Sequence, residues 1–478
     1  MKVEFVGQSV RDGDNAQSDP SRLVNFYRYN LGGTPVLRSV LGTEAFAEID
    51  AVFLRALHEY DGKVFAALGG NLYKVRKSGV SVLMDSITDS AQTSISVNNG
   101  IITIAAGGDY ANFTVAGAKT TPATGAFSSV GSVAFLGQRT IITELNGRRI
   151  SWSDVTDPAT FDGFNFATAE SSYDDIVRGV VIGSQYWVFK KESIERWYLT
   201  GSGDATQFLA PIAGASLGRG LKSFNLLTTL PNGAFFVGSD GKAYIVGEGM
   251  QPVSTRGVET SIKTDDPTHC LYYQDEGQEF CVIRFGNRPA WVYDLTTGEW
   301  HERAEAFDRP WSAIASVKAW GDHYVGTDTG LINRLARVNT DVSGPLIRSA
   351  VSRTLEFEGK GRVISNITFA PTVGQSRIME ASEILDAGGG EALDVDGGVL
   401  AMYITDPDAI EARALFEISS DRGQTWRREM WRGLGLRGEY DKVVNLRALG
   451  QHRNANIRMT ISEPSDTAIV STADVVVA

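Results

Sequence analysis

A pattern of glycine turns and apolar strands recurs along the first two thirds of the 478-residue chain. Each copy has a turn with Gly, an apolar or aromatic strand, a second Gly turn and another strand. Clear examples are YDGKVFAALGGNLYKV (Tyr60–Val75) and PNGAFFVGSDGKAYIV (Pro231–Val246). Gly and Asn accept the positive φ that tight hairpin turns require. Each copy therefore predicts a β-hairpin.

The spacing of these copies indicates how the hairpins combine. The first glycine recurs at intervals of 35 to 53 residues, which is the size of a four-stranded propeller blade. A β-solenoid would use shorter and stricter periods, and a sandwich would not need so many copies. We therefore predict an all-β chain with an irregular β-propeller of six or seven blades over residues 45–340. The marker glycines are Gly62, Gly100, Gly137, Gly183, Gly233, Gly286 and Gly321.

Sequence on either side of the repeats predicts two further regions. Residues 1–44 form an N-terminal entry segment. The stretch Ala45–Tyr60 has apolar residues at near-helical spacing, but we favour a strand that leads into the first blade. The polar link Arg337–Leu346 ends the propeller, and alternating residues then predict a β-sandwich-like domain over residues 345–478. Within it, the Gly- and Asp-rich segment Ser382–Gly398 predicts an exposed loop.

Composition restricts the partners and the compartment. A formal net charge of −12 argues against a general nucleic-acid-binding surface, which needs clustered Lys and Arg. No apolar run is long enough for a membrane-spanning helix, and the N-terminus lacks the apolar core of a signal peptide. We expect synthesis in a cytoplasm. Cys270 and Cys281 are expected to be ordinary buried thiols, although they could face each other across a hairpin.

One motif points toward enzymes. The stretch SSDRGQTW (Ser419–Trp426) matches the Asp box known from sialidases and other carbohydrate-active propellers. Its marked residues suit a structural turn: side-chain oxygens can bond the turn backbone, Gly permits positive φ, and the Trp is expected to pack into the core beneath. A single copy outside the predicted propeller favours a turn over a catalytic site. The residues are Ser419, Asp421, Gly423, Thr425 and Trp426.

Other candidate chemistry is weaker. The five His residues form no metal-binding or catalytic spacing, and no phosphate-binding loop is present. Asp394–Gly397 is similar to part of a calcium loop but lacks the remaining ligands and the closing Glu. We therefore predict no catalytic residue, no cofactor and no metal. The five His residues of the chain are His58, His269, His301, His323 and His452.

Three stretches resemble one family of bacteriophage proteins. They are RLVNFYRYN (Arg22–Asn30) with the GGTPVLRSVLGTEAF that follows, the hairpin GRRISWSDVTDPATFDG (Gly147–Gly163), and the Asp box together with Gly433–Pro464. In this order they resemble the tail hub or nozzle proteins of short-tailed phages, also called packaged-DNA stabilisation proteins. Phe26-Tyr27-Arg28 stands where that family commonly has Tyr-Pro.

The resemblance implies a structural virion protein without enzymatic activity. Such a protein would form a homo-oligomeric ring of six subunits below the portal and adaptor rings. The ring would line the DNA exit channel, retain packaged DNA, take part in genome ejection and dock tail fibres or spikes. DNA would pass without sequence-specific binding and no membrane would be involved. An acidic lumen would let DNA slide, because like charges repel the phosphates.

Two alternatives remain open from the residues alone. The first is a sialidase-like or glycan-binding propeller of a phage tail, which the Asp box favours. The second is a scaffold propeller with no viral role.

Overall fold

The computed structural model groups the chain into two compact units. One, here called the propeller unit, comprises Thr43–Gly298 and Asp308–Leu335. The other, here called the terminal unit, comprises Met1–Gly42, Glu299–Phe307 and Ala336–Ala478. The residues expected as a separate entry segment thus cluster with the C-terminal region, and so does a nine-residue segment from inside the repeats.

The structure describes most of both units. The described residues are 2–4, 9, 20–31, 34–49, 52–120, 127–341, 344–357, 361–369, 371–372, 394–395, 398–399, 412–435, 442–463, 468–470 and 472–477. The predicted loop Ser382–Gly398 and the motif Asp394–Gly397 lie outside them, except where they include the short strands β40 (Asp394–Val395) and β41 (Gly398–Val399).

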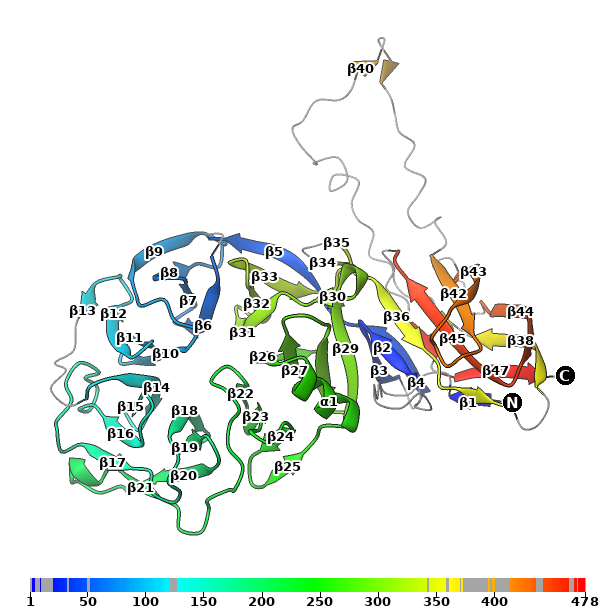
Figure 1. Ribbon diagram of the computed structural model, residues 1–478. Helices are drawn as coiled ribbons and strands as arrows, with labels where there is room; N and C mark the ends of the chain where they lie inside the picture. Colours follow the sequence, from blue (N-terminus) through cyan, green and yellow to red (C-terminus); the bar gives the residue numbers. More distant parts are fainter. Residues whose placement is uncertain are drawn as a thin grey trace. The chain divides into compact units, whose positions relative to one another are not determined.

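The propeller unit consists of successive antiparallel sheets arranged in chain order around a ring (Figure 1). The first three blades are β6 (Leu54–Tyr60), β7 (Lys63–Leu68), β8 (Asn71–Val75) and β9 (Ser81–Ser86); β10 (Thr93–Asn98), β11 (Ile101–Ala106), β12 (Asp109–Thr114) and β13 (Lys119–Thr120); and β14 (Val130–Leu136), β15 (Arg139–Glu144), β16 (Arg149–Trp152) and β17 (Phe166–Thr168).

The fourth and fifth blades repeat this plan, and the sixth has three strands within the propeller unit. They are β18 (Ile176–Ile182), β19 (Gln185–Lys190), β20 (Ile194–Leu199) and β21 (Leu209–Pro211); β22 (Leu227–Leu230), β23 (Gly233–Val237), β24 (Ala243–Val246) and β25 (Met250–Pro252); and, in the sixth, β26 (Pro267–Asp275), β27 (Gln278–Phe285) and β28 (Ala290–Asp294). The helix α1 (Arg256–Thr264) precedes the sixth blade, and the 3-10 turn η1 (Ala205–Gln207) lies in the fourth.

The seventh blade closes the ring with strands from distant parts of the chain. It pairs β31 (Ala313–Ala319), β32 (Asp322–Thr327) and β33 (Leu331–Ala336) with β5 (Gly42–Glu48). The first strands of the seven blades lie side by side in chain order, and β31 lies beside β6. The prediction of a propeller is confirmed, with seven blades. The described parts of Ala45–Tyr60 include two strands, β5 and β6, so the preference for extended structure is confirmed, but β5 belongs to the last blade.

A recurring turn explains the sequence repeat. In every blade the first two strands are joined by two residues. In five blades both residues have positive φ, as at Asp61-Gly62 (51° and 66°), which is the conformation that matches strand twist. The marker for the sixth repeat was misplaced, because Gly286 follows β27 and the equivalent turn is Glu276-Gly277.

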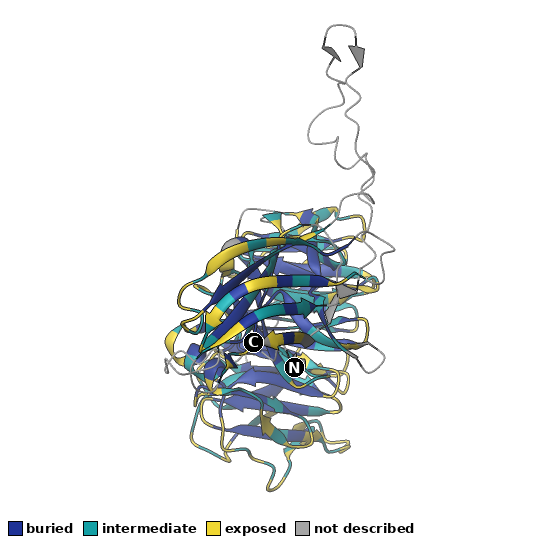
Figure 2. Ribbon diagram, turned by 90° about the vertical axis from the view of Figure 1, so that its right-hand side faces the viewer, coloured by how far each residue is buried: buried dark blue, intermediate teal, exposed yellow. Residues whose placement is uncertain are grey.

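The terminal unit contains a β-sandwich. One sheet has the order β29-β2-β36-β45-β42-β43, another has the order β1-β47-β38-β44, and a small sheet has the order β3-β4-β46-β39. Apolar residues of the sheets share one core that includes Leu23, Phe26, Ile367, Phe416 and Ile457. Buried and exposed residues alternate along parts of these strands (Figure 2), as expected for sheets with one packed face.

The strands of the terminal unit come from all three of its segments. They are β1 (Lys2–Glu4), β2 (Arg22–Val24), β3 (Phe26–Leu31), β4 (Thr34–Ser39), β29 (Glu299–Glu305), β34 (Thr340–Asp341), β35 (Gly344–Pro345), β36 (Arg348–Val351), β37 (Leu355–Glu356), β38 (Arg362–Phe369), β39 (Pro371–Thr372), β42 (Arg413–Ser419), β43 (Arg427–Gly433), β44 (Val444–His452), β45 (Asn454–Ile461), β46 (Ala468–Val470) and β47 (Thr472–Val477). The 3-10 turn η2 (Ala306–Asp308) and strand β30 (Arg309–Pro310) follow β29. Among the described residues, no helix has the length and apolar character needed to cross a membrane.

Candidate functional site

The Asp box forms the connection between β42 and β43. Ser419 Oγ donates to Asp421 Oδ1 at 2.6 Å and accepts from the Gly423 amide at 2.9 Å. The Thr425 amide donates to Asp421 Oδ1 at 2.8 Å, and its hydroxyl donates to Oδ2 at 2.5 Å. Hydrogen bonds from Ser419 and then Thr425 hold the pKa of the Asp421 carboxyl well below its ordinary value. The oxygens of the motif are thus engaged in bonds within the turn.

The sequence suggested that Trp426 packs into the core, but the structure places it at the surface of the turn. Its side chain is half-buried, and the Arg458 guanidinium stacks over its ring at 4.5 Å. Arg458 in turn pairs with Glu417 of β42 at 2.6 Å. Gly423 has φ of +83°, and a side chain there would approach the Trp426 ring. The ring therefore covers the turn from the surface side.

A second group of polar side chains, in the terminal unit, holds strand β29, which comes from the segment Glu299–Phe307. Glu302 is fully buried and accepts two hydrogen bonds at 2.8 Å from Arg22, through Nε and Nη2. Ser9 donates to the same carboxylate at 3.3 Å. One residue along, Arg303 pairs with Asp341 at 2.7 Å, and both side chains are almost fully buried. Charge-assisted bonds of this geometry are strong and specific.

Asn25 forms further, uncharged hydrogen bonds with the same strand. Its left-handed backbone (φ 57°) directs the side-chain amide to the Ala304 carbonyl at 2.9 Å and the Ile347 carbonyl at 2.7 Å. Its oxygen accepts from the Ala304 amide at 3.0 Å. Sequence reasoning missed this cluster, because Arg22 and Asn25 lie about 280 residues before the strand that they bind.

The propeller unit has a cavity of about 620 Å³, open to solvent, between the first strands of its blades. The lining includes Arg55 and His58 of β6, Arg178 of β18, and His269 and Cys270 of β26. Hydroxyl and amide groups of Ser96, Asn225, Thr228, Thr229 and Ser316 also line it. None of the described lining residues is Asp or Glu, although the chain has 57 acidic residues.

Histidines and cysteines show no catalytic arrangement in the part of the chain that the structure describes. The structure brings His58 and His269 to one cavity, which their sequence positions did not suggest, and places His301, His323 and His452 elsewhere. No group of three or more His, Cys, Asp or Glu side chains within the described residues could hold a metal ion.

The two thiols behave as the sequence predicted. Cys270 and Cys281 are free and buried, and burial raises the pKa of both. They do not face each other across the hairpin, because Cys270 pairs with Ile283 and Cys281 pairs with Tyr272.

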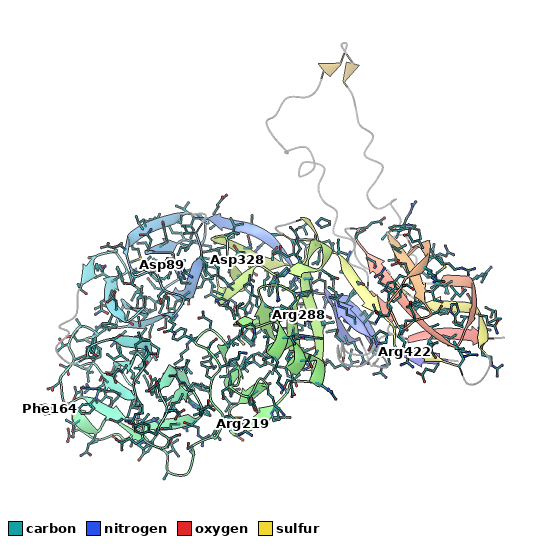
Figure 3. The ribbon with its side chains drawn as sticks, in the orientation of Figure 1. Asp89, Phe164, Arg219, Arg288, Asp328 and Arg422 are labelled. Carbon is teal, nitrogen blue, oxygen red and sulfur yellow. The ribbon has the colours of Figure 1, made fainter. Side chains whose placement is uncertain are left out.

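An exposed aromatic surface lies on the outer part of the third blade. Phe164 and Tyr173 are 77% and 89% exposed, and Phe164 points outward (Figure 3). The Arg148 guanidinium stacks on Tyr173 and that of Arg149 stacks on Phe166, both at 4.0 Å. Aromatic residues and Arg are the types enriched in protein interfaces.

Ring closure and blades of three or four antiparallel strands define the class: this is a β-propeller protein with an appended β-sandwich. A sequence model of the family described as "Bacteriophage P22 Gp10, beta-propeller" matches residues 5–337. The match spans more than half of the chain, and the protein belongs to that family. The resemblance noted from the sequence is thereby confirmed, and the family indicates a packaged-DNA stabilisation protein of the phage tail, located in the virion.

Comparison with curated proteins finds no sequence match. Among solved structures, the chain is similar to the computationally designed Ika8 protein, with a TM-score of 0.40 and 12% identity over 61% of this chain and 99% of the other. It is also similar to the Neurospora crassa Pan2 WD40 domain, with a TM-score of 0.43 and 11% identity over 63% of this chain and 95% of the other.

A third similarity is to the extracellular domain of a putative hybrid two-component system from B. thetaiotaomicron. The TM-score is 0.44 and the identity 9%, over 69% of this chain and 42% of the other. The chain thus spans less than half the length of that structure. At these scores, none of the three bears on function.

Proposed function

We propose that this protein is a structural subunit of the tail hub or nozzle of a short-tailed phage. In this proposal, copies assemble in the host cytoplasm into a ring, with six as the expected number, below the portal and adaptor rings. The ring lines the DNA exit channel, retains packaged DNA until ejection and docks tail fibres or spikes. The observation that carries the proposal is the family match over residues 5–337.

The terminal unit supports a role under mechanical load. Strand β29 is anchored by a buried bidentate pair to Arg22, by the Arg303–Asp341 pair and by Asn25. Breaking a buried ion pair by removing one partner costs about 3–5 kcal/mol. A subunit that must hold DNA under pressure would be stabilised by these bonds, because β29 cannot move away from the segments of Arg22, Asn25 and Asp341 without breaking them.

Lateral or partner contacts also have a candidate surface. The aromatic surface of Phe164, Phe166 and Tyr173, with its stacked arginines, has the composition of an interface core. We assign it to the contact with a neighbouring copy in the ring. Phe164→Ser combined with Tyr173→Ser should shift the assembled species toward monomer in light scattering after size exclusion. Val80→Ser, at an exposed apolar residue of the first blade, should leave assembly unchanged.

The sialidase-like alternative has less support. The Asp box oxygens are engaged within their own turn. The central cavity, where a propeller enzyme would hold its substrate, is lined by no carboxylate among the described residues, whereas glycoside hydrolysis commonly uses acidic side chains.

Electron microscopy of virions tests the proposal directly. A ring on the tail axis that disappears when the gene is deleted, with particles that lose their DNA after packaging, is the expected result. Tails that retain an unchanged axis, or a purified protein that hydrolyses a sialoside or host polysaccharide, would overturn it. Mobility-shift assays should show no sequence preference for DNA.

A further inference from the structure

We propose that the central cavity of the propeller binds a small oxyanion of the phosphate class, with Arg178 as its charged anchor. This goes beyond the proposed tail function, since it concerns a ligand inside one subunit. A volume of about 620 Å³ lies within the range of small-molecule sites and admits inorganic phosphate, pyrophosphate or a mononucleotide.

The first argument is charge compensation. Arg55, the other arginine that lines the cavity, has a carboxylate partner, since it pairs with Asp89 at 2.7 Å. Arg178 pairs with no carboxylate among the described residues. Its Nη1 donates only to two backbone carbonyls, of Phe224 at 3.2 Å and Leu227 at 3.3 Å. Arg178 is half-buried, and an anion in the cavity would supply the counter-charge that a guanidinium partly shielded from water lacks.

The second argument concerns the charge of the cavity wall. Besides Arg178, the wall carries Arg55, His58 and His269, and none of its described residues is Asp or Glu. A wall with cationic groups and no carboxylate favours an anionic ligand.

The surroundings of Arg178 favour a fixed anchor. The guanidinium lies 4.7 Å from the centre of the Phe224 ring, and the two carbonyl contacts set its plane. Burial lowers the pKa of Arg178 to about 10, so the group keeps its charge at neutral pH. A planar guanidinium held this way suits an oxyanion, which accepts two hydrogen bonds at once.

The test is titration calorimetry of the full-length protein with orthophosphate, pyrophosphate and dAMP, in buffer free of phosphate and at constant ionic strength. Wild type should bind at least one of them, and Arg178→Gln should weaken that binding by at least about 30-fold. Arg219→Gln is the matched control, because Arg219 is exposed and lies outside the cavity (Figure 3). It should bind as wild type does.

Preference among the three probes identifies the source. Tighter binding of dAMP assigns a nucleotide, and tighter binding of pyrophosphate assigns an inorganic phosphate; both outcomes support the proposal. Absence of binding by wild type, or equal binding by wild type and Arg178→Gln, overturns it.

A second variant covers the case in which Arg178→Gln fails to fold. Thr228 lines the cavity next to Leu227, whose carbonyl contacts Arg178. Thr228→Asp should supply the missing carboxylate, raise the melting temperature in phosphate-free buffer and abolish anion binding. Unchanged anion binding by this variant would overturn the proposal. Ring assembly should be normal in all these variants, so failure of the anion proposal is distinguishable from failure of the tail function.

Discussion

Leu54 is the residue on which closure of the propeller can be tested most directly. It begins β6 in the first blade, is fully buried, and shares an apolar cluster with Ile314, Tyr324 and Ile332 of the seventh blade. Its side chain packs on the backbone of Gly326 in β32, where an added Cβ would lie 2.5 Å from Leu54 Cδ1. The first and last blades therefore meet through this side chain.

Replacement of Leu54 by Ala should destabilise the propeller unit by about 3–4 kcal/mol. Buried Leu→Ala changes cost about 2–5 kcal/mol, depending on how far the site can collapse. Here Gly326 belongs to a paired strand and has no side chain to fill the space, which places the cost in the middle to upper range. At about 2 °C per kcal/mol for a unit of this size, the melting temperature should fall by about 6–8 °C.

Calorimetry or intrinsic fluorescence on heating measures the effect. The matched control is Leu83→Ala, since Leu83 lies on β9 of the same blade and is 56% exposed. Gly326→Ala should itself cost about 1–3 kcal/mol through overpacking, and less in a Leu54→Ala background, where the space is open. Equal melting temperatures for Leu54→Ala and Leu83→Ala, or a cost of Gly326→Ala that is independent of Leu54, would refute this account of closure.

Three further outcomes are expected. Asp421→Asn should lower the melting temperature of the terminal unit. The pKa of Asp421 in the folded protein lies below the ordinary 3.8, so the carboxylate stabilises the fold above pH 3.8 and this stabilisation is lost in more acidic solution. The difference in melting temperature from wild type should therefore become smaller as the pH falls below 3.8. Glu302→Gln leaves Arg22 without its buried counter-charge and should cost about 3–5 kcal/mol in urea unfolding, whereas Glu299→Gln, in a more exposed pair, should cost about 0–1 kcal/mol. Cys270 and Cys281 should resist alkylation in the native protein and react after unfolding, as mass spectrometry would show; rapid native labelling would contradict their burial.

Much of the fold could be predicted because local sequence encodes the hairpins. Residue pairs such as Asp61-Gly62 and Asn99-Gly100 specify left-handed turns by themselves. The blade count was left between six and seven because the position of the marker glycine varies: Gly233 begins a strand and Gly286 follows the end of one. Neither residue occupies the turn that defines the repeat.

The candidate sites were less predictable, because their residues meet only through long-range topology. Nothing near Glu302 in the chain identifies Arg22 or Ser9 as its partners. Likewise, Arg178 and His269 reach one cavity only because the first strands of the blades form a closed ring. The Asp box was recognisable because its hydrogen bonds span at most four residues, and even there the position of Trp426 was wrong.

The division of the chain between its two units has a consequence for biosynthesis. The polypeptide leaves the terminal unit after Gly42, returns to it for Glu299–Phe307, and enters it for the last time at Ala336. A nascent chain can thus complete neither unit before about residue 335 has left the ribosome. Termination before the seventh blade would leave the ring open and the sandwich without most of its strands. A propeller transplanted into another protein would carry β29, which belongs to the terminal unit. Exchange of parts between related phages should therefore succeed when both units are transferred together and fail when a junction divides either unit.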